Sequence, residues 1–201
     1  MGVTANCIKL LERNITGVKT CIELGAQYLY DTNEHLKDIE NNTPTFAKEW
    51  FIGKGISHVS IDLNGEGDYI GNIEMAIYTT GANNKAQNVI GIFWNDPGFL
   101  PVDLVTDFGT IEHCTDLWGA LKNCHHLTKV GGLMIHCNPM VGHWEGHGHH
   151  YFTKEFWIEL AKLNDYEIVE CYEELMYGSK TGGVVYAVLR KLNDNKFNVN
   201  T

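Results

Sequence analysis

The sequence lacks a long apolar run. Its longest uninterrupted apolar stretch covers residues 184–189, whereas a membrane-spanning helix needs roughly 20 apolar residues. The apolar segment of a signal peptide is also missing, because Glu12, Arg13 and Asn14 stand where it would lie, and Asn6 breaks the myristoylation pattern. We therefore expect a cytoplasmic chain that does not enter a membrane.

Closely spaced cysteines and an excess of basic residues are missing too. The 6 cysteines include no Cys-x-x-Cys pair, so we expect reduced, mostly buried thiols. The chain has 15 Lys and Arg against 25 Asp and Glu, and its formal net charge of −10 is the wrong sign for a surface that binds phosphate backbones. Glycine and proline, at 21 and 4 residues, are close to average usage, which excludes collagen-like and low-complexity chains. The composition therefore disfavours nucleic acid as a partner.

The hydrophobic content and its pattern along the chain are typical of one compact α/β domain. Hydrophobic residues make up 44% of the 201 positions, enough to bury a substantial core. Short β-rich runs alternate with amphipathic stretches, which is typical of an α/β domain with a largely parallel sheet. We expect a single domain over residues 1–192, followed by a polar, frayed tail over residues 193–201.

The pattern predicts the following elements. Expected helices cover residues 4–14, 45–52, 115–127 and 153–164. Expected strands cover residues 19–24, 58–63, 102–106, 133–137, 167–171 and 183–189. Residues 73–80 and 89–94 look extended and fit either a hairpin or an irregular third strand. We expect the glycine pair in the turn at 129–132 to end one helix and Thr153 to cap the next.

Residues with ligand-binding chemistry follow the first two predicted strands. Ligands of open α/β sheets bind outside the carboxyl ends of the strands. Gly25 follows the first strand and lets the backbone approach a ligand closely, and Asp62 at the tip of the second strand can accept hydrogen bonds from a ribose diol. The pair indicates a nucleoside-cofactor site, although Gly25 as a simple turn residue and Asp62 as a solvated strand end would explain it equally well.

Five motifs follow one another along the chain. They are Glu23 with Gly25, Asp62, an Asp-Leu-Val run at 103–105, Glu112 with His113, and a Lys-Val-Gly-Gly turn at 129–132. In this order the chain resembles the class I S-adenosylmethionine-dependent methyltransferases over roughly residues 19–190. The resemblance implies a doubly wound, mostly parallel seven-strand-type sheet with an antiparallel C-terminal edge and helices on both faces. It also implies S-adenosylmethionine as cofactor and methyl transfer to an oxygen or nitrogen of a small-molecule acceptor.

The same resemblance implies which residues hold the cofactor. These are Glu23, Gly25, Ala26, Gln27, Asp62, Leu63, Asp107, Phe108 and Gly109. The first loop departs from the family pattern, because the family has three glycines there and this chain keeps only Gly25. The resemblance indicates no clear acidic adenine-binding residue after the third strand, where Asn95 and Asp96 are the candidates.

Glu112 and His113 are the expected catalytic pair. They follow the strand at 102–106, where the resembled family places its catalytic face, and an imidazole with an ordinary pKa of ~6.5 can take a proton near neutral pH. Alternatively, Glu112 caps the following helix and His113 packs under the loop. Metal-dependent relatives resemble a Glu-x-x-Glu-His pattern, but the first position here is Gly109, which counts against a metal at this pair.

The loop at 138–152 is the second candidate, because it holds 4 of the chain's 10 histidines. In the resembled family this loop covers the acceptor, and His143 or His147 would then close over it. A metal-dependent or metal-binding protein that uses this loop is the alternative, as is a non-catalytic module with the same fold. His125 and His126 are expected on a solvated helix face.

Overall fold

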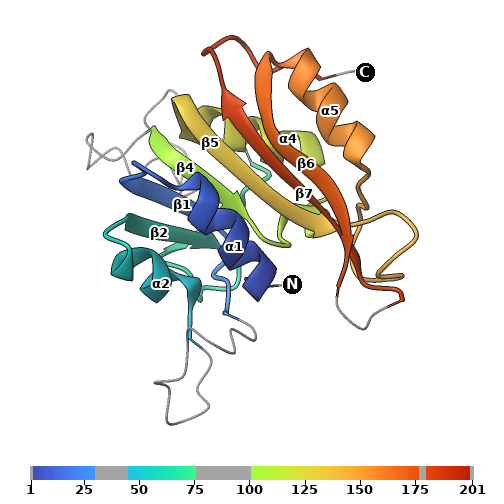
Figure 1. Ribbon diagram of the computed structural model, residues 1–201, viewed down its shortest axis with the longest axis horizontal. Coiled ribbons are helices and arrows are strands. Elements are labelled where there is room, and N and C mark those ends of the chain that lie inside the picture. Colours follow the sequence, from blue (N-terminus) through green and yellow to red (C-terminus); the bar gives the residue numbers. More distant parts are fainter. Residues whose placement is uncertain (1, 30–44, 76–100, 177–179, 200–201) are drawn as a thin grey trace.

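The computed structural model describes residues 2–29, 45–75, 101–176 and 180–199. Its centre is a seven-stranded sheet with the strand order β3-β2-β1-β4-β5-β7-β6 (Figure 1). The strands are β1(Thr20–Leu24), β2(Ser57–Asp62), β3(Tyr69–Ile70), β4(Val102–Asp107), β5(Thr128–Pro139), β6(Tyr166–Leu175) and β7(Gly183–Lys191). Only β7 runs antiparallel to its neighbours β5 and β6 among these strands. The expected mostly parallel sheet with an antiparallel C-terminal edge is confirmed.

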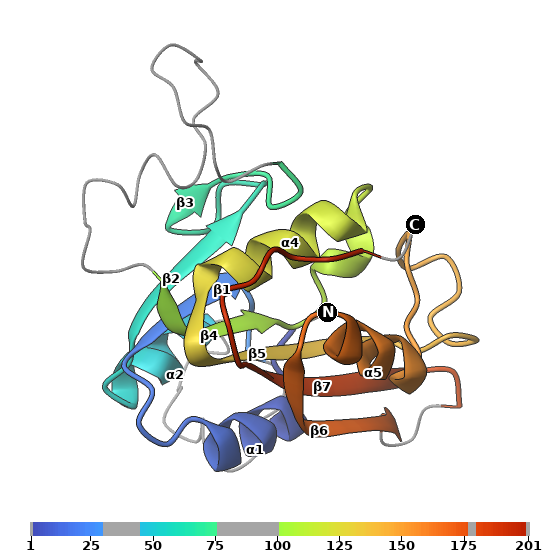
Figure 2. The same cartoon turned by 90° about the horizontal axis from the view of Figure 1, so that it is seen from above.

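Helices cover both faces of the sheet, as expected. They are α1(Ala5–Asn14), α2(Ala47–Gly53), α4(Leu117–Leu127) and α5(Lys154–Leu163), with a 3-10 turn η1(Ile111–His113) after β4. The helices α1 and α2 pack on one face and α4 and α5 on the other, and Figure 2 shows α4 and α1 on opposite sides of the sheet. Thr153 caps α5 as predicted, because its hydroxyl accepts a hydrogen bond from Phe156 N at 3.2 Å.

Each central strand contributes to two cores. Along β4, Leu104 is buried against α1 and α2, whereas the next residue, Val105, is buried against α4 and α5. Strands covered on both faces tend to read as apolar runs, which is why residues 184–189 of β7 are recognisable as a strand from the sequence. In β4 only Val102, Leu104 and Val105 are apolar. Over the described residues, no helix has both the length and the apolar character that a membrane crossing would need. All six cysteines are free thiols, and only Cys171 is partly exposed.

The register brings three strand ends to one edge of the sheet. Leu24 at the end of β1 pairs with Ile61 of β2 on one side and with Asp107 of β4 on the other. The loops that follow these strands therefore begin side by side. This edge is where ligands of open α/β sheets bind.

Two expected elements differ from the structure. The strand β5 begins at Thr128, directly after α4, so residues 129–132 belong to the strand rather than to a separate turn; Gly131, at φ +83°, accompanies the register shift against β4. The strand expected at 73–80 is wrong over its described start, because residues 73–75 form a turn and β3 lies earlier. The run at 89–94 lies outside the described residues.

The C-terminal segment does not fray over residues 193–199. Phe197 is buried against the α4 and α5 face, and Asn198 N donates a hydrogen bond of 2.7 Å to Asn164 Oδ1. His125 is buried rather than solvated, because its Nε2 lies 2.9 Å from the carbonyl oxygen of Asn195 in this segment. The expected solvated helix face is therefore wrong for His125, since the C-terminal segment covers it.

Candidate active site

Glu23 ends β1 as a buried carboxylate with incomplete hydrogen bonding. Its Oε2 lies 3.4 Å from His58 Nε2 and accepts a hydrogen bond of 3.4 Å from Gln27 N. Its buried Oε1 has no hydrogen-bond partner in the part of the chain that the structure describes. Burial raises the pKa of Glu23, and the neighbouring His58 opposes that rise. A polar ligand with a hydrogen to donate could satisfy the free oxygen.

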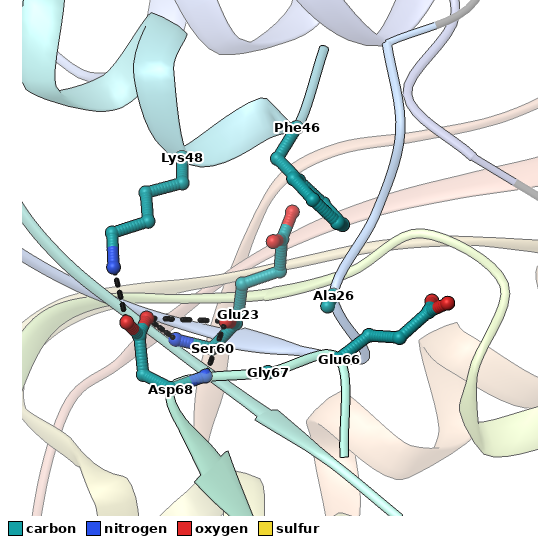
Figure 3. Close-up of a pocket in the computed structure, with 8 residues that line it drawn as sticks. All are labelled: Glu23, Ala26, Phe46, Lys48, Ser60, Glu66, Gly67 and Asp68. Atoms are coloured by element: carbon teal, nitrogen blue, oxygen red, sulfur yellow. Dashed lines mark hydrogen bonds and ion pairs between the residues drawn. The ribbon is translucent and has the colours of Figure 1, made fainter. Parts of the chain in front are cut away.

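A pocket of about 190 Å³ lies beside Glu23. It is lined by Glu23, Ala26, Phe46, Lys48, Ser60, Glu66, Gly67 and Asp68, and Figure 3 shows the Glu23 carboxylate pointing toward Phe46. Lys48 forms an ion pair with Asp68, whose other oxygen accepts hydrogen bonds from Ser60 N and Oγ. Burial alone would raise the pKa of Asp68, but the bonds from Lys48 and Ser60 lower it. Asp68 is therefore a charged residue in the lining of the pocket.

The loop after β1 is held by Gly25 and Asp62. Gly25 has φ +78°, and a Cβ there would collide with the side chains of Gln27 and Thr110. Asp62 Oδ2 accepts a hydrogen bond of 2.8 Å from Ala26 N, which ties the tip of β2 to this loop. Its Oδ1 accepts another of 2.8 Å from Asn64 N. A carboxylate has about four acceptor positions, so these two bonds leave Asp62 able to accept others.

Asp107, at the end of β4, is saturated by donors of its own chain. Its Oδ1 accepts hydrogen bonds from Thr110 N at 3.0 Å and Ile111 N at 3.2 Å. Its Oδ2 lies 3.0 Å from His136 Nδ1 and accepts a hydrogen bond of 2.9 Å from Asn138 Nδ2. These four contacts use the hydrogen-bond acceptor positions of the carboxylate. Asp107 therefore stabilises the turn after β4 instead of facing the open edge.

Glu112 lies in η1, and its buried side chain forms a cluster with two histidines. Its side chain is fully buried, and Oε2 accepts a hydrogen bond of 3.2 Å from Asn138 Nδ2. Its Oε1 lies 3.7 Å from His113 Nε2 and 3.6 Å from His147 Nε2. Burial and the nearby charge of Asp107 raise the pKa of Glu112 to about 7. Burial lowers the pKa of both histidines.

The histidine-rich loop wraps around the backbone of Glu112. The carbonyl oxygen of Glu112 accepts hydrogen bonds from His149 N at 2.8 Å and His150 N at 3.0 Å. A Cβ on Gly148 would come within 2.9 Å of the same oxygen, so glycine permits this close approach. The wrapping places His147 next to His113, with ring centroids 4.9 Å apart.

No protein-family model matches the chain, and no curated protein is significantly similar to it. Solved structures share its architecture. The Burkholderia thailandensis 1,6-didemethyltoxoflavin-N1-methyltransferase, solved with 1,6-didemethyltoxoflavin and S-adenosylhomocysteine, has a TM-score of 0.53 and 13% identity over 92% of this chain and 76% of that one. The N-methyltransferase NodS from Bradyrhizobium japonicum has a TM-score of 0.55 and 13% identity, covering 92% and 94%. A SAM-dependent methyltransferase from Methanosarcina mazei has a TM-score of 0.55 and 11% identity, covering 92% and 98%.

The chain has the class I S-adenosylmethionine-dependent methyltransferase fold. At these identities the likeness concerns the fold, and it agrees with the strand order and with the mixed sheet expected from the sequence. The candidate site of this methyltransferase fold has two parts at the carboxyl edge of the sheet. One part holds Glu23, Gly25, Ala26, Gln27 and Asp62, and the other holds Glu112, His113 and His147.

Other expected site residues lie apart from these two groups. Leu63 is exposed, and Phe108 is buried in the core on the α1 face. Gly109 has φ +88° and serves the turn after β4. His143 packs next to Gly183, where a Cβ would come within 3.0 Å of the imidazole. Asn95 and Asp96 lie outside the described residues.

Sequence reasoning missed several polar residues of the methyltransferase-fold edge. Asn138 links Asp107 to Glu112, and its position directly after the strand predicted at 133–137 is the signal that could have found it. Lys48 and Asp68 meet across the pocket from α2 and the loop before β3. No sequence spacing connects these two residues, because their contact depends on how α2 and the loop before β3 pack against the sheet.

Proposed function

We propose that this chain is an S-adenosylmethionine-dependent methyltransferase that acts on an oxygen or nitrogen of a small-molecule acceptor. The observation that carries the proposal is the hydrogen bond from Ala26 N to Asp62, because it fixes an acidic strand tip against the glycine-bearing loop of a methyltransferase fold. The S-adenosylhomocysteine bound to the Burkholderia thailandensis enzyme and to NodS, and the small-molecule acceptor bound to the former, support it at the level of the fold.

The residues of the first part fit this cofactor chemically. S-adenosylmethionine carries a cationic amino group, a cationic sulfonium and a ribose diol, all of which favour carboxylate partners. We assign Asp62 to the ribose hydroxyls and the unpartnered oxygen of Glu23 to the amino-acid end of the cofactor. Gln27 stands where the family has a glycine. Its side-chain amide donates a hydrogen bond to Thr110 Oγ1 and fills space on that side of the loop that a glycine would leave open. When bound, the cofactor supplies an electrophilic methyl group.

The second part of the candidate site, formed by Glu112, His113 and His147, suits reaction with the methyl acceptor. Methyl transfer needs an aligned nucleophile, exclusion of water and a group that takes the acceptor's proton. Glu112 has a pKa of about 7, so the buried cluster that it forms with His113 and His147 can hold that proton near neutral pH. A hollow beside His147 is lined by Trp144, Glu145, Gly146, His147, Thr181 and Gly182. Together with the net charge of −10, this hollow favours a small acceptor over nucleic acid.

Calorimetric titration with S-adenosylmethionine and S-adenosylhomocysteine tests the proposal. We expect one site per chain and thermal stabilisation by either ligand. Asp62→Asn should weaken binding at least about tenfold, because a hydrogen bond to a charged group contributes about 1.5–3 kcal/mol. The amide oxygen of the new side chain can still accept from Ala26 N, so the loop after β1 should keep its shape, whereas the bond that Asn64 N donates to the other oxygen of Asp62 is lost.

The matched control is Glu159→Gln, which removes an exposed carboxylate that bonds to Lys162 on α5. This variant should bind both ligands as the wild type does. The absence of binding heat and of thermal stabilisation with both ligands would overturn the proposed function.

A further inference from the structure

We propose that Glu112, His113 and His147 bind a divalent transition-metal ion through Glu112 Oε1 and the two Nε2 atoms. The three ligand atoms lie within 4.8 Å of one another. The sequence alone counted against a metal at Glu112 and His113, because Gly109 stands where metal-dependent relatives have an acidic residue. The structure instead brings His147 to the pair from a loop more than thirty positions further along the chain. The inference does not depend on the proposed function.

Unpartnered ligand atoms are the first argument. Glu112 Oε1 and His147 Nε2 are both buried, and neither has a hydrogen-bond partner within the described ranges. They lie 3.6 Å apart, which is too far for a good hydrogen bond. Two ligands at about 2.1 Å from a tetrahedral ion are about 3.4 Å apart. The observed gap therefore suits a shared metal ion better than direct contact.

The surroundings of the cluster hold its ligands in place. Asn138 Nδ2 bonds to Glu112 Oε2 at 3.2 Å, which leaves Oε1 as the oxygen that faces the histidines. Tyr151 accepts a hydrogen bond of 3.0 Å from His147 N and donates one of 2.8 Å to Trp144 O. Such supporting hydrogen bonds orient metal ligands and raise metal affinity. The site is thus organised by residues that do not themselves bind the ion.

The donor set indicates the class of metal. One carboxylate and two imidazoles suit Zn²⁺, Mn²⁺, Fe²⁺ or Co²⁺, whereas Mg²⁺ and Ca²⁺ prefer oxygen ligands. Three protein ligands leave at least one coordination position for water or substrate. The side chains of His113 and His147 are 46% and 27% exposed, so an ion can reach the site from solvent. A nitrogen that binds a metal cannot also take a proton, so the proton acceptance proposed above for this cluster applies to the chain without a bound ion.

The test is metal titration of the untagged, chelator-treated chain without S-adenosylmethionine. Calorimetry with Zn²⁺ and Mn²⁺, and absorption spectra with Co²⁺, should report about one ion per chain and coordination by nitrogen. Glu112→Gln and His147→Asn should each weaken binding at least tenfold. Thermal unfolding of each metal-free variant shows whether it has kept the fold.

The control is His126→Asn, which removes a histidine on α4 outside the cluster and should leave metal affinity unchanged. The proposed metal site is wrong if no ion binds, or if His113→Asn and His147→Asn bind the ion as tightly as the wild type does. Binding that persists in both variants would assign the ion to other histidines of the chain. Because the cofactor is absent from this titration, the outcome is separate from that of the proposed function.

Discussion

At the scale of single residues, the buried carboxylates of the sheet edge differ in how many donors reach them. Asp107 receives hydrogen bonds on both oxygens from four groups of its own chain. Glu23 and Glu112 each keep one buried oxygen without a partner in the described residues. Leaving a buried polar atom unsatisfied costs about 1–3 kcal/mol. The two carboxylates that carry this cost are therefore better candidates for ligand contact than Asp107.

His125 gives a prediction at this scale. Asn195 O can only accept, so His125 Nε2 donates to it at 2.9 Å, and Nδ1 accepts from the Tyr166 hydroxyl at 2.8 Å. Burial, together with the charges of Lys191 and His126, lowers the pKa of His125 to about 4. The unfolded value is ~6.5, so the unfolded chain binds more protons between these values. Stability from His125 is complete above pH ~6.5 and falls toward pH 4 by on the order of 1 kcal/mol per pH unit.

Urea unfolding of the wild type and of His125→Gln at pH 7.5 and pH 5 measures this effect. The loss of stability on acidification should be smaller in the variant by about 1 kcal/mol or more, because glutamine does not titrate. Other groups titrate in both proteins and cancel in the difference. An equal loss in both would show that His125 does not set this part of the pH dependence.

The candidate site could be predicted from the sequence only in part, and its histidines show why. Glu112 and His113 are adjacent and follow a recognisable strand, so their position near the sheet edge could be inferred. Which histidine of the loop joins them could not, because the path of the loop depends on residues with positive φ. Gly142 and Gly146 have φ +80° and +76°, and Trp144 has φ +55°. A nonglycine residue in this region gives no sequence signal.

At the scale of elements, the strands buried on both faces were predicted well and the connections poorly. The strand β7 contains a continuous apolar run over residues 184–189 and lies where expected. The strand β3 has only two residues and an exposed Ile70, so its sequence has neither length nor alternation to reveal it. Its pairing depends instead on the turn in which Asp68 accepts hydrogen bonds from Ser60.

The C-terminal segment gives a prediction at this scale. Phe197→Ala should destabilise the chain by about 1–3 kcal/mol, below the 3–5 kcal/mol typical of a buried Phe→Ala change. The cost is smaller because a terminal segment can undock without unfolding the whole domain. Hydrogen exchange should show lost protection over residues 193–199 and at α4, where the segment covers His125.

Val199→Ala is the matched control for this prediction. Val199 is in the same segment but is exposed, so its truncation should change stability by less than about 0.5 kcal/mol. Equal effects of the two substitutions would mean that the segment does not dock through Phe197.

At the scale of the whole molecule, one sheet separates two cores. Leu104 on β4 is buried against the α1 and α2 face, and Leu189 on β7 is buried against the α4 and α5 face. Both faces use the same strands. Loss of the packing on one face therefore also destabilises the strands that support the core on the other face. We infer that the two cores unfold together, although the chain is longer than most domains that unfold in one step.

Leu104→Ala and Leu189→Ala test this coupling with the same chemical change on opposite faces. Both side chains are fully buried, so each substitution should cost about 2–5 kcal/mol from lost burial and the cavity left behind. Thermal unfolding followed by near-ultraviolet and far-ultraviolet circular dichroism should give coincident single transitions for both variants, shifted to lower temperature. A variant that melts in two steps, with one probe ahead of the other, would show that each core unfolds by itself. Coincident transitions would show that the sheet unfolds as one unit, and with it the edge that carries both parts of the candidate site.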